Sequence, residues 1–201
     1  MIKNIIFDLG NVLLSFKPEQ FLMNFIKDKN RIIKFIANVI QTDTWLQLDR
    51  GNISLKNAQR HFISTYPEEK ELIILFFNHW QEMLIPIQTN IDLVKELKSN
   101  GYRLYVLSNF MIEAFDFVKA RYNFFSLFDG IVISGNIQII KPEMGIYQHL
   151  LQKYNLNPEE SVFIDDVEQF TLQADNMYMK TIHYLPTTDL RSELRRLDVK
   201  I

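Results

Sequence analysis

From residue 87 onward, short apolar segments alternate with segments whose apolar residues recur at helical spacing. The expected strands are YRLYVLS, DGIVIS, SVFIDD and KTIHYL. The expected helices are NIDLVKELKSNG, MIEAFDFVKARY, KPEMGIYQHLLQKYNL with Pro142 near its first turn, EQFTLQADNMY and TDLRSELRRL. Repeated strand and helix units favour a parallel sheet with helices on both faces. With KNIIF at residues 3–7 as a further buried strand, the sequence predicts an α/β fold with a doubly wound parallel sheet.

A block of different character interrupts this pattern. FLMNFIKDKNRIIKFIANVIQ, SLKNAQRHFISTY and EEKELIILFFNHWQEML carry apolar residues at helical spacing, without the alternation of a strand. Ser54 and Pro67 mark expected helix starts. We therefore expect three to five helices forming a cap domain, residues 16–86, inserted into a core domain made of residues 1–15 and 87–201. An insertion directly after the first strand can fold over the edge of the sheet as a lid.

Composition restricts the partners and the chemistry. The net charge is −2, so no overall positive field recruits nucleic acid or an anionic membrane. Cysteine is absent, which excludes disulfides, thiolate nucleophiles and cysteine metal sites. No segment has the length of a membrane span, and MIKNIIFDLG lacks the long apolar region of a signal peptide. We expect a cytoplasmic protein, a monomer or weak homodimer, that binds neither nucleic acid nor membranes.

Polar residues stand where the expected strands end. Asp8, Ser108 and the pair Asp165 and Asp166 each close a strand, and Lys141 follows a fourth strand after a short loop. Ligands of open α/β sheets bind beyond the carboxyl ends of the strands, so we expect these side chains to converge. Clustered carboxylates need a cation, and an all-oxygen set suits Mg²⁺. A hydroxyl and an ammonium suit phosphate oxygens, so the set favours phosphoryl transfer.

Each of these residues also has a purely structural interpretation. A strand-terminal aspartate often caps the next helix, and Ser108 and Asn109 are ordinary turn residues. Lys141 before a proline is most simply a surface lysine. The ordered placement of four polar clusters at strand ends supports the functional interpretation more strongly than any single residue does.

The segments FDLGNVLL, VLSN, KPEMGIY and VFIDD resemble the four ordered motifs of the haloacid dehalogenase superfamily, over almost the whole chain. FDLGNV, together with LDRGNIS in the insertion, is most similar to a branch of bacterial sugar-phosphate phosphatases. That branch is also similar to the N-terminal phosphatase domain of mammalian soluble epoxide hydrolases. The resemblance implies a Mg²⁺-dependent phosphatase that hydrolyses a small phosphorylated metabolite, such as a hexose 1-phosphate, through an aspartyl-phosphate intermediate.

The resemblance also implies a metal site. Asp8 would be the nucleophile, and it would bind Mg²⁺ together with the backbone carbonyl of Gly10. Asp166 would be the direct acidic ligand, and Asp165 would either hold a metal-bound water or support the direct ligands without touching the metal.

The substrate-binding residues follow from the same resemblance. Ser108 and the backbone N–H of Asn109 would hold phosphate oxygens, and Lys141 would orient Asp8 and offset its charge. In the insertion, Trp45 is a candidate for stacking on the substrate, although packing between helices is its commoner role.

Gly10 departs from the pattern of the family. Most of its phosphatases carry a second aspartate there, which protonates the leaving group, and such help is typically worth ~10²–10⁴ in rate. Three explanations stay open: substrates with easier leaving groups such as sugar 1-phosphates, a weak or inactive relative that binds a phosphorylated ligand, or a 2-haloacid dehalogenase. Dehalogenases carry an aromatic residue at this place, and the LDRG context of Arg50 indicates a structural role rather than halide binding. Phe170 is a second departure, because the family commonly has an asparagine there.

Overall fold

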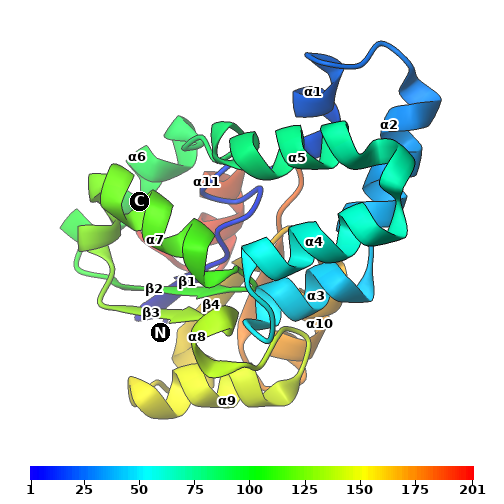
Figure 1. Ribbon diagram of the computed structural model, residues 1–201. Helices are drawn as coiled ribbons and strands as arrows, with labels where there is room; N and C mark the ends of the chain where they lie inside the picture. The colour runs from blue at the N-terminus through cyan, green and yellow to red at the C-terminus, as the bar shows by residue number, and fades with distance from the viewer.

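The computed structural model describes residues 1–201 and contains a five-stranded parallel sheet beside a group of inserted helices (Figure 1). The strands are β1 (Asn4–Phe7), β2 (Arg103–Ser108), β3 (Gly130–Ile133), β4 (Ser161–Asp165) and β5 (Lys180–His183). Their order is β3-β2-β1-β4-β5, and every neighbouring pair is parallel. The predicted α/β fold is confirmed. The order changes direction between β1 and β4, which is where ligands of such sheets bind.

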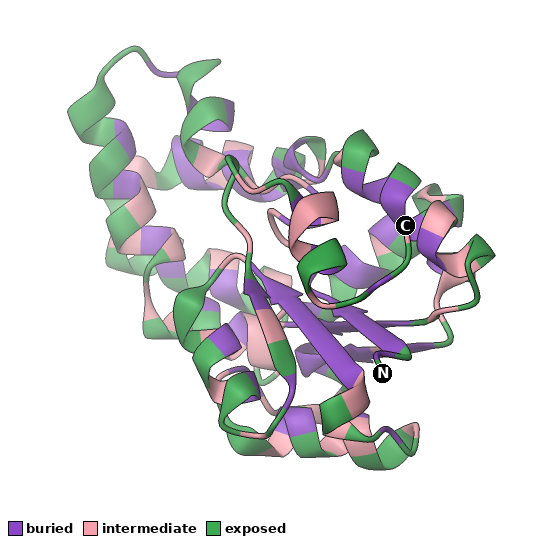
Figure 2. Ribbon diagram, turned by 180° about the vertical axis from the view of Figure 1, so that it is seen from behind, coloured by how far each residue is buried: buried purple, intermediate pink, exposed green.

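Helices cover both faces of the sheet because both faces of each strand are apolar. One face carries α6 (Gln88–Ser99), α7 (Ile112–Arg121) and α11 (Leu190–Arg196), and the other carries α9 (Met144–Lys153) and α10 (Glu168–Asp175) (Figure 1). In β1, Ile5 and Phe7 belong to the first apolar cluster and Ile6 to the second, as the alternation of a strand requires. Figure 2 shows the central strands buried along their length. None of the helices combines the length and apolar character needed to span a bilayer.

The insertion between β1 and α6 forms helices joined by loops and contains no strand, as predicted. Its α-helices are α1 (Pro18–Met23), α2 (Lys29–Phe35), α3 (Asp43–Arg50), α4 (Leu55–Thr65) and α5 (Lys70–His79), with a π-helical turn at Ile36–Ile40 and 3₁₀ turns at Pro67–Glu69 and Trp80–Met83. The Ser54 side chain accepts a hydrogen bond from the Asn57 backbone and caps α4, and Pro67 opens the turn before α5. Both predicted helix starts are confirmed.

Aromatic side chains join the inserted helices to the sheet. Trp45 of α3 lies 6.1 Å from Phe76 of α5 and 6.2 Å from Phe16, measured between ring centroids. These side chains belong to or pack against the same apolar cluster of 44 buried residues that includes Phe7 of β1. The insertion therefore shares its core with the sheet rather than touching it only at the surface.

The segment before α9 differs from the prediction. The helix begins at Met144, so Pro142 lies outside its first turn, and Glu143 is an extended N-cap. The Asn109 side chain explains this, because it accepts from the Lys141 backbone N–H at 2.7 Å and donates to the Lys141 carbonyl at 3.0 Å. Pro142 also disfavours a helical backbone conformation at Lys141, the residue before it. The loop from β3 contains a short helix, α8 (Ser134–Ile137), that the sequence did not indicate.

Candidate active site

The predicted residues meet at the carboxyl edge of the sheet. Asp8 directly follows β1, Ser108 ends β2 and Asp165 ends β4, because each strand runs in the same direction. Asp8, Asp165 and Asp166 each offer a carboxylate oxygen, and these oxygens all lie within 4.8 Å of one another. The convergence expected from the strand ends is thus present in the fold.

Lys141 is a buried bridge between two of the carboxylates. Its side chain is 1% exposed, and Nζ lies 2.7 Å from Asp8 Oδ1 and 2.5 Å from Asp165 Oδ2. The third ammonium proton goes to the Leu107 carbonyl at 3.1 Å. Burial lowers the pKa of Lys141, but the carboxylates of Asp165 and Asp8 outweigh it and the pKa is raised. The ammonium is therefore held in its charged form beside Asp8, and the surface-lysine interpretation is wrong.

Phe170 contacts Lys141 as well. Its ring centroid lies 5.0 Å from Lys141 Nζ, and the ring of Phe163 lies 5.4 Å away from the same atom. A cation over an aromatic face is attracted to it, more so where water is excluded. The Phe170 ring thus attracts the Lys141 ammonium group, at a position where the family commonly has an asparagine.

The aspartate pair divides into a fully buried and a half-buried member. Asp165 accepts hydrogen bonds from Lys141 and from the Val167 backbone N–H at 2.9 Å, and Asp166 accepts one from Asn11 Nδ2 at 2.9 Å. Burial raises the pKa of Asp165, against the opposing charge of Lys141. Burial, and then the charge of Asp8, raises the pKa of Asp166.

The charge balance fits a divalent cation. Three carboxylates and one ammonium leave two uncompensated negative charges in a largely buried site. The donors are all oxygen, which is the set that Mg²⁺ prefers. Asp166 accepts a hydrogen bond from one other side chain, Asn11, whereas both oxygens of Asp165 are engaged, by Lys141 and by the Val167 N–H. This difference agrees with Asp166 as the direct ligand and Asp165 as a supporting residue.

Ser108 has the property expected of a ligand-binding hydroxyl. Its side chain is buried, and its Oγ atom has no hydrogen-bond partner within the protein. Buried hydroxyls without partners are rare in folded proteins. Because the Asn109 side chain is used on the Lys141 backbone, only the Asn109 N–H is left for a phosphate oxygen.

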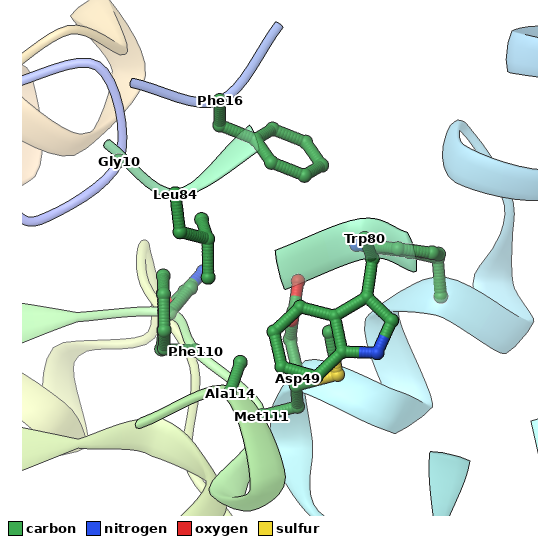
Figure 3. Close-up of a pocket in the computed structure, with 10 residues that line it drawn as sticks. Gly10, Phe16, Asp49, Trp80, Leu84, Phe110, Met111 and Ala114 are labelled. Carbon is green, nitrogen blue, oxygen red and sulfur yellow. The ribbon is translucent and has the colours of Figure 1, made fainter. Parts of the chain in front are cut away.

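A cavity of 120 Å³ lies between this site and the inserted helices (Figure 3). Its lining residues are Gly10, Phe16, Trp45, Asp49, Trp80, Leu84, Asn109, Phe110, Met111 and Ala114. Seven of these ten are hydrophobic, and the Trp80 ring N–H has no hydrogen-bond partner. Trp45 both packs against Phe16 and Phe76 and lines the cavity, so its two predicted roles are compatible.

Asp49 is the residue that the sequence interpretation left without a role. It is half-buried in the cavity wall, and burial, followed by the negative charge of Asp8, raises its pKa to about 8. Polar contacts with the Trp45 ring and the Met111 backbone act in the opposite direction on this pKa. One sequence signal could have identified it: Asp49 lies four residues after Trp45 in α3, and therefore on the same helix face as that buried tryptophan.

The end of α3 is attached to the loop that carries Lys141. Arg50 forms an ion pair with Glu143 and donates to the Gln138 carbonyl at 3.2 Å. Gly51 adopts a left-handed conformation with φ of 80°, and a Cβ there would collide with the backbone of Gly135. The structural role predicted for Arg50 agrees with these contacts.

Comparison with known proteins identifies relatives over most of the chain. A family model described as haloacid dehalogenase-like hydrolase matches residues 2–169. A sesquiterpene phosphatase of Aspergillus oryzae is 27% identical over 195 residues, which cover 97% of this chain and 96% of the relative. A glyceraldehyde 3-phosphate phosphatase of Methanothermobacter thermautotrophicus is 30% identical over 137 residues, or 63% of this chain and 60% of the relative.

Among solved structures, a haloacid dehalogenase family enzyme from Bacteroides thetaiotaomicron, in complex with magnesium and inorganic phosphate, has a similar fold. The TM-score is 0.76 at 23% sequence identity, and the match covers 97% of this chain and 100% of the other. At this level of identity the similarity establishes a shared fold.

Proposed function

The chain belongs to the haloacid dehalogenase-like hydrolases, and we propose that it is a Mg²⁺-dependent phosphomonoesterase with Asp8 as its nucleophile. The observation that carries the proposal is the buried contact of Lys141 with Asp8, next to the Asp165 and Asp166 carboxylates. One buried ammonium group cannot neutralise three carboxylates, and a divalent cation would neutralise the remaining negative charge. When bound, Mg²⁺ supplies positive charge that stabilises the phosphoryl oxygens.

The side chains and backbone groups of the site have separate roles in phosphoryl transfer. Asp8 attacks phosphorus and forms an aspartyl phosphate. Lys141 keeps the Asp8 carboxylate oriented through its Oδ1 atom and offsets its charge. The Ser108 hydroxyl and the Asn109 N–H hold phosphate oxygens. The Ser108 hydroxyl has no hydrogen-bond partner within the protein, and the Asn109 side chain, which bonds to the Lys141 backbone, leaves the Asn109 N–H for this role. Asp8, the Gly10 carbonyl and Asp166 would hold the metal. Asp165 would support these ligands through its contact with Lys141.

We assign the inserted helices, within residues 16–86, the role of a cap, and residues 1–15 and 87–201 that of the core. The cavity supports this division because it is lined from both sides, by Trp45 and Asp49 of α3 and by the loop after β2. A substrate bound there would be shielded from water, so the cap has to move for entry and exit.

The cavity lining bears on the substrate. The sequence favours a sugar phosphate, but a hexose has several hydroxyl groups that need hydrogen-bond partners when buried. The lining is mostly hydrophobic, and its polar groups are limited to Asp49, Asn109 and the indole N–H groups. An engineered apolar cavity of about 150 Å³ holds one benzene ring, so a cavity of 120 Å³ suits a small apolar group. The apolar lining therefore favours the phosphate ester of a short isoprenoid or an aryl alcohol. The sesquiterpene phosphatase of Aspergillus oryzae is named for an apolar substrate too, although a sesquiterpene is larger than this cavity.

Two other functions have less support. For a dehalogenase, Arg50 is the candidate halide ligand in the cap, but this guanidinium is occupied by Glu143 and Gln138. The case for an inactive ligand-binding relative is that Gly10 and Phe170 depart from the pattern of the family. The departure at Phe170 is weaker evidence for lost activity, because the Phe170 ring contacts the Lys141 ammonium group.

The proposal is tested by phosphate release from phenyl phosphate, dimethylallyl phosphate and glucose 1-phosphate, each with Mg²⁺ and with EDTA. We expect Mg²⁺-dependent release with the highest kcat/KM on the two apolar esters. A preference for glucose 1-phosphate would favour the sugar-phosphate substrate instead. No release from any of the three by folded protein with Mg²⁺ would contradict the phosphatase proposal.

A further inference from the structure

The loop after Asp8 leaves space for a side chain that this protein lacks. A Cβ atom placed on Gly10 would have only Asp8 Oδ2 nearby, at 3.7 Å, and Gly10 itself lines the cavity beneath the cap. A side chain at position 10 would therefore project into free space beside Asp8, at the wall of the cavity that Phe16 of the same loop also lines.

Asp49 borders the same cavity from the cap. Among the ten lining residues it is the only one with a titratable side chain. Figure 3 shows Asp49 on one side of the cavity and Gly10 on the other. A small organic group that fills 120 Å³ between them would touch both walls, with its phosphate at the end nearer Asp8.

The core holds the Asp49 backbone in place. Ser134 Oγ donates a hydrogen bond to the Asp49 carbonyl at 2.6 Å, and the same oxygen accepts one from the Phe110 N–H at 2.9 Å. Phe110 directly follows Asn109, so one buried hydroxyl links Asp49 to the loop that would hold phosphate. The Arg50–Glu143 ion pair and the close approach of Gly51 to Gly135 attach the next two residues.

We infer that Asp49 is the proton donor to the leaving group, supplied by the cap in place of the side chain missing at Gly10. This inference rests on the proposed phosphatase function. As Asp8 Oδ bonds to phosphorus, the bond between phosphorus and the ester oxygen breaks, and the Asp49 proton passes to that oxygen to give the alcohol. The Asp49 carboxylate then takes a proton from water, whose oxygen bonds to phosphorus as the bond to Asp8 breaks. Inorganic phosphate leaves, and Asp49 is protonated again.

The surroundings of Asp49 suit this role. Its neighbours in the cavity wall include the apolar side chains of Phe110, Met111 and Ala114, and burial among them favours the neutral, protonated carboxyl group. This effect outweighs the polar contacts with the Trp45 ring and the Met111 backbone, which favour the ionised form. A carboxyl group that is protonated at neutral pH is what general acid catalysis needs.

The test is the dependence of kcat/KM on the leaving group in Asp49→Asn. For phenethyl phosphate, whose alkoxide is a poor leaving group, we expect a fall of ~10²–10⁴, the usual value of general acid help. For 4-nitrophenyl phosphate, whose leaving group departs without a proton, we expect a fall of less than about tenfold. The ratio kcat/KM reports steps up to phosphoryl transfer to Asp8, so slower hydrolysis of the intermediate does not mask the difference.

Two further variants complete the design. Asp43→Asn removes an exposed carboxylate from the first turn of the same helix and should leave both kcat/KM values unchanged. Gly10→Asp, for which the loop has space, should restore at least part of the phenethyl phosphate activity lost in Asp49→Asn.

Equal losses on both esters, or no loss on either, would overturn the assignment of Asp49. Mg²⁺-dependent hydrolysis of 4-nitrophenyl phosphate by the unaltered protein would still support the phosphatase function in that case. The two conclusions therefore fail separately.

Discussion

Lys141 and Asp8 form an ion pair 2.7 Å long, in which the lysine side chain is 1% exposed and the aspartate side chain 9%. Lys141 also neutralises Asp165, so one ammonium group serves two buried carboxylates. Removing one member of a buried ion pair leaves an uncompensated charge and is strongly destabilising.

Lys141→Met should therefore lower the free energy of unfolding by about 3–5 kcal/mol in EDTA and abolish phosphatase activity. Mg²⁺ should raise the melting temperature of this variant more than that of the unaltered protein, because more negative charge is left uncompensated. Thermal melts with EDTA and with Mg²⁺ measure both effects. Lys56→Met, at an exposed position without an ion pair, is the control; equal stability of the two variants would contradict the role of the pair.

Ser108→Ala tests the hydroxyl that lacks a partner. Because Ser108 Oγ makes no hydrogen bond within the protein, its removal should leave the melting temperature nearly unchanged while KM for phosphate esters rises at least several-fold. Ser161 provides a matched buried serine, since its Oγ accepts from Asn4 at 3.0 Å and donates to the Asn157 carbonyl at 2.8 Å. Ser161→Ala should lower stability by about 1–3 kcal/mol and leave KM unchanged. The opposite pattern in the two variants would refute a phosphate-binding role for Ser108.

The ion pair of Arg50 with Glu143 should affect catalysis more than stability. Both side chains are partly exposed, at 22% and 44%, and exposed pairs contribute only about 0–1 kcal/mol to folding. We expect Arg50→Ala and Glu143→Ala each to lower kcat/KM, and the double variant to lose less than the product of the two single losses, because they break the same contact. Arg31→Ala breaks a comparable ion pair with Glu69 inside the cap and should leave kcat/KM unchanged. Independent, multiplicative losses would show that Arg50 and Glu143 do not act as a pair.

The stability of the metal-free protein should depend on pH through Asp49. The pKa of an aspartate in an unfolded chain is about 3.9, and burial raises the pKa of Asp49 to about 8 in the folded protein. Between these values the folded state binds more protons than the unfolded state, so Asp49 lowers stability as pH rises. Asp49→Asn should consequently raise the melting temperature in EDTA, by little at pH 5 and by more at pH 8.

Asp43→Asn removes an exposed carboxylate from the same helix and is the matched control variant. Melting curves recorded from pH 5 to pH 8 provide the comparison. A constant difference between Asp49→Asn and the unaltered protein across this range would mean that Asp49 is ionised in the folded state.

The polar ends of the strands were predictable from sequence because the fold class determines where they meet. Asp8, Ser108 and Asp165 need only be placed at the ends of parallel strands, and the short apolar segments before them indicate those strands. Apolar residues at helical spacing predicted the helical insertion, and Ser54 as an N-cap residue predicted the start of α4.

The contacts between cap and core were not predictable in this way. The hydrogen bond from Ser134 to Asp49 joins residues 85 positions apart, and the contact of Arg50 with Glu143 joins residues 93 positions apart. Such pairs depend on how the inserted helices pack on the sheet, which local periodicity does not encode. Pro142 was misplaced for a related reason, because the Asn109 side chain holds the neighbouring Lys141 backbone outside the helix.

The central claim is that Asp8 is the nucleophile of a Mg²⁺-dependent phosphatase. Phosphate release from 4-nitrophenyl phosphate by the unaltered protein and by Asp8→Asn, with Mg²⁺ and with EDTA, tests it most directly. The asparagine keeps the shape of the side chain, and a circular dichroism melt would show whether the variant is folded. We predict Mg²⁺-dependent release by the unaltered protein and none by folded Asp8→Asn. Release that persists in EDTA, or in folded Asp8→Asn, would contradict the account.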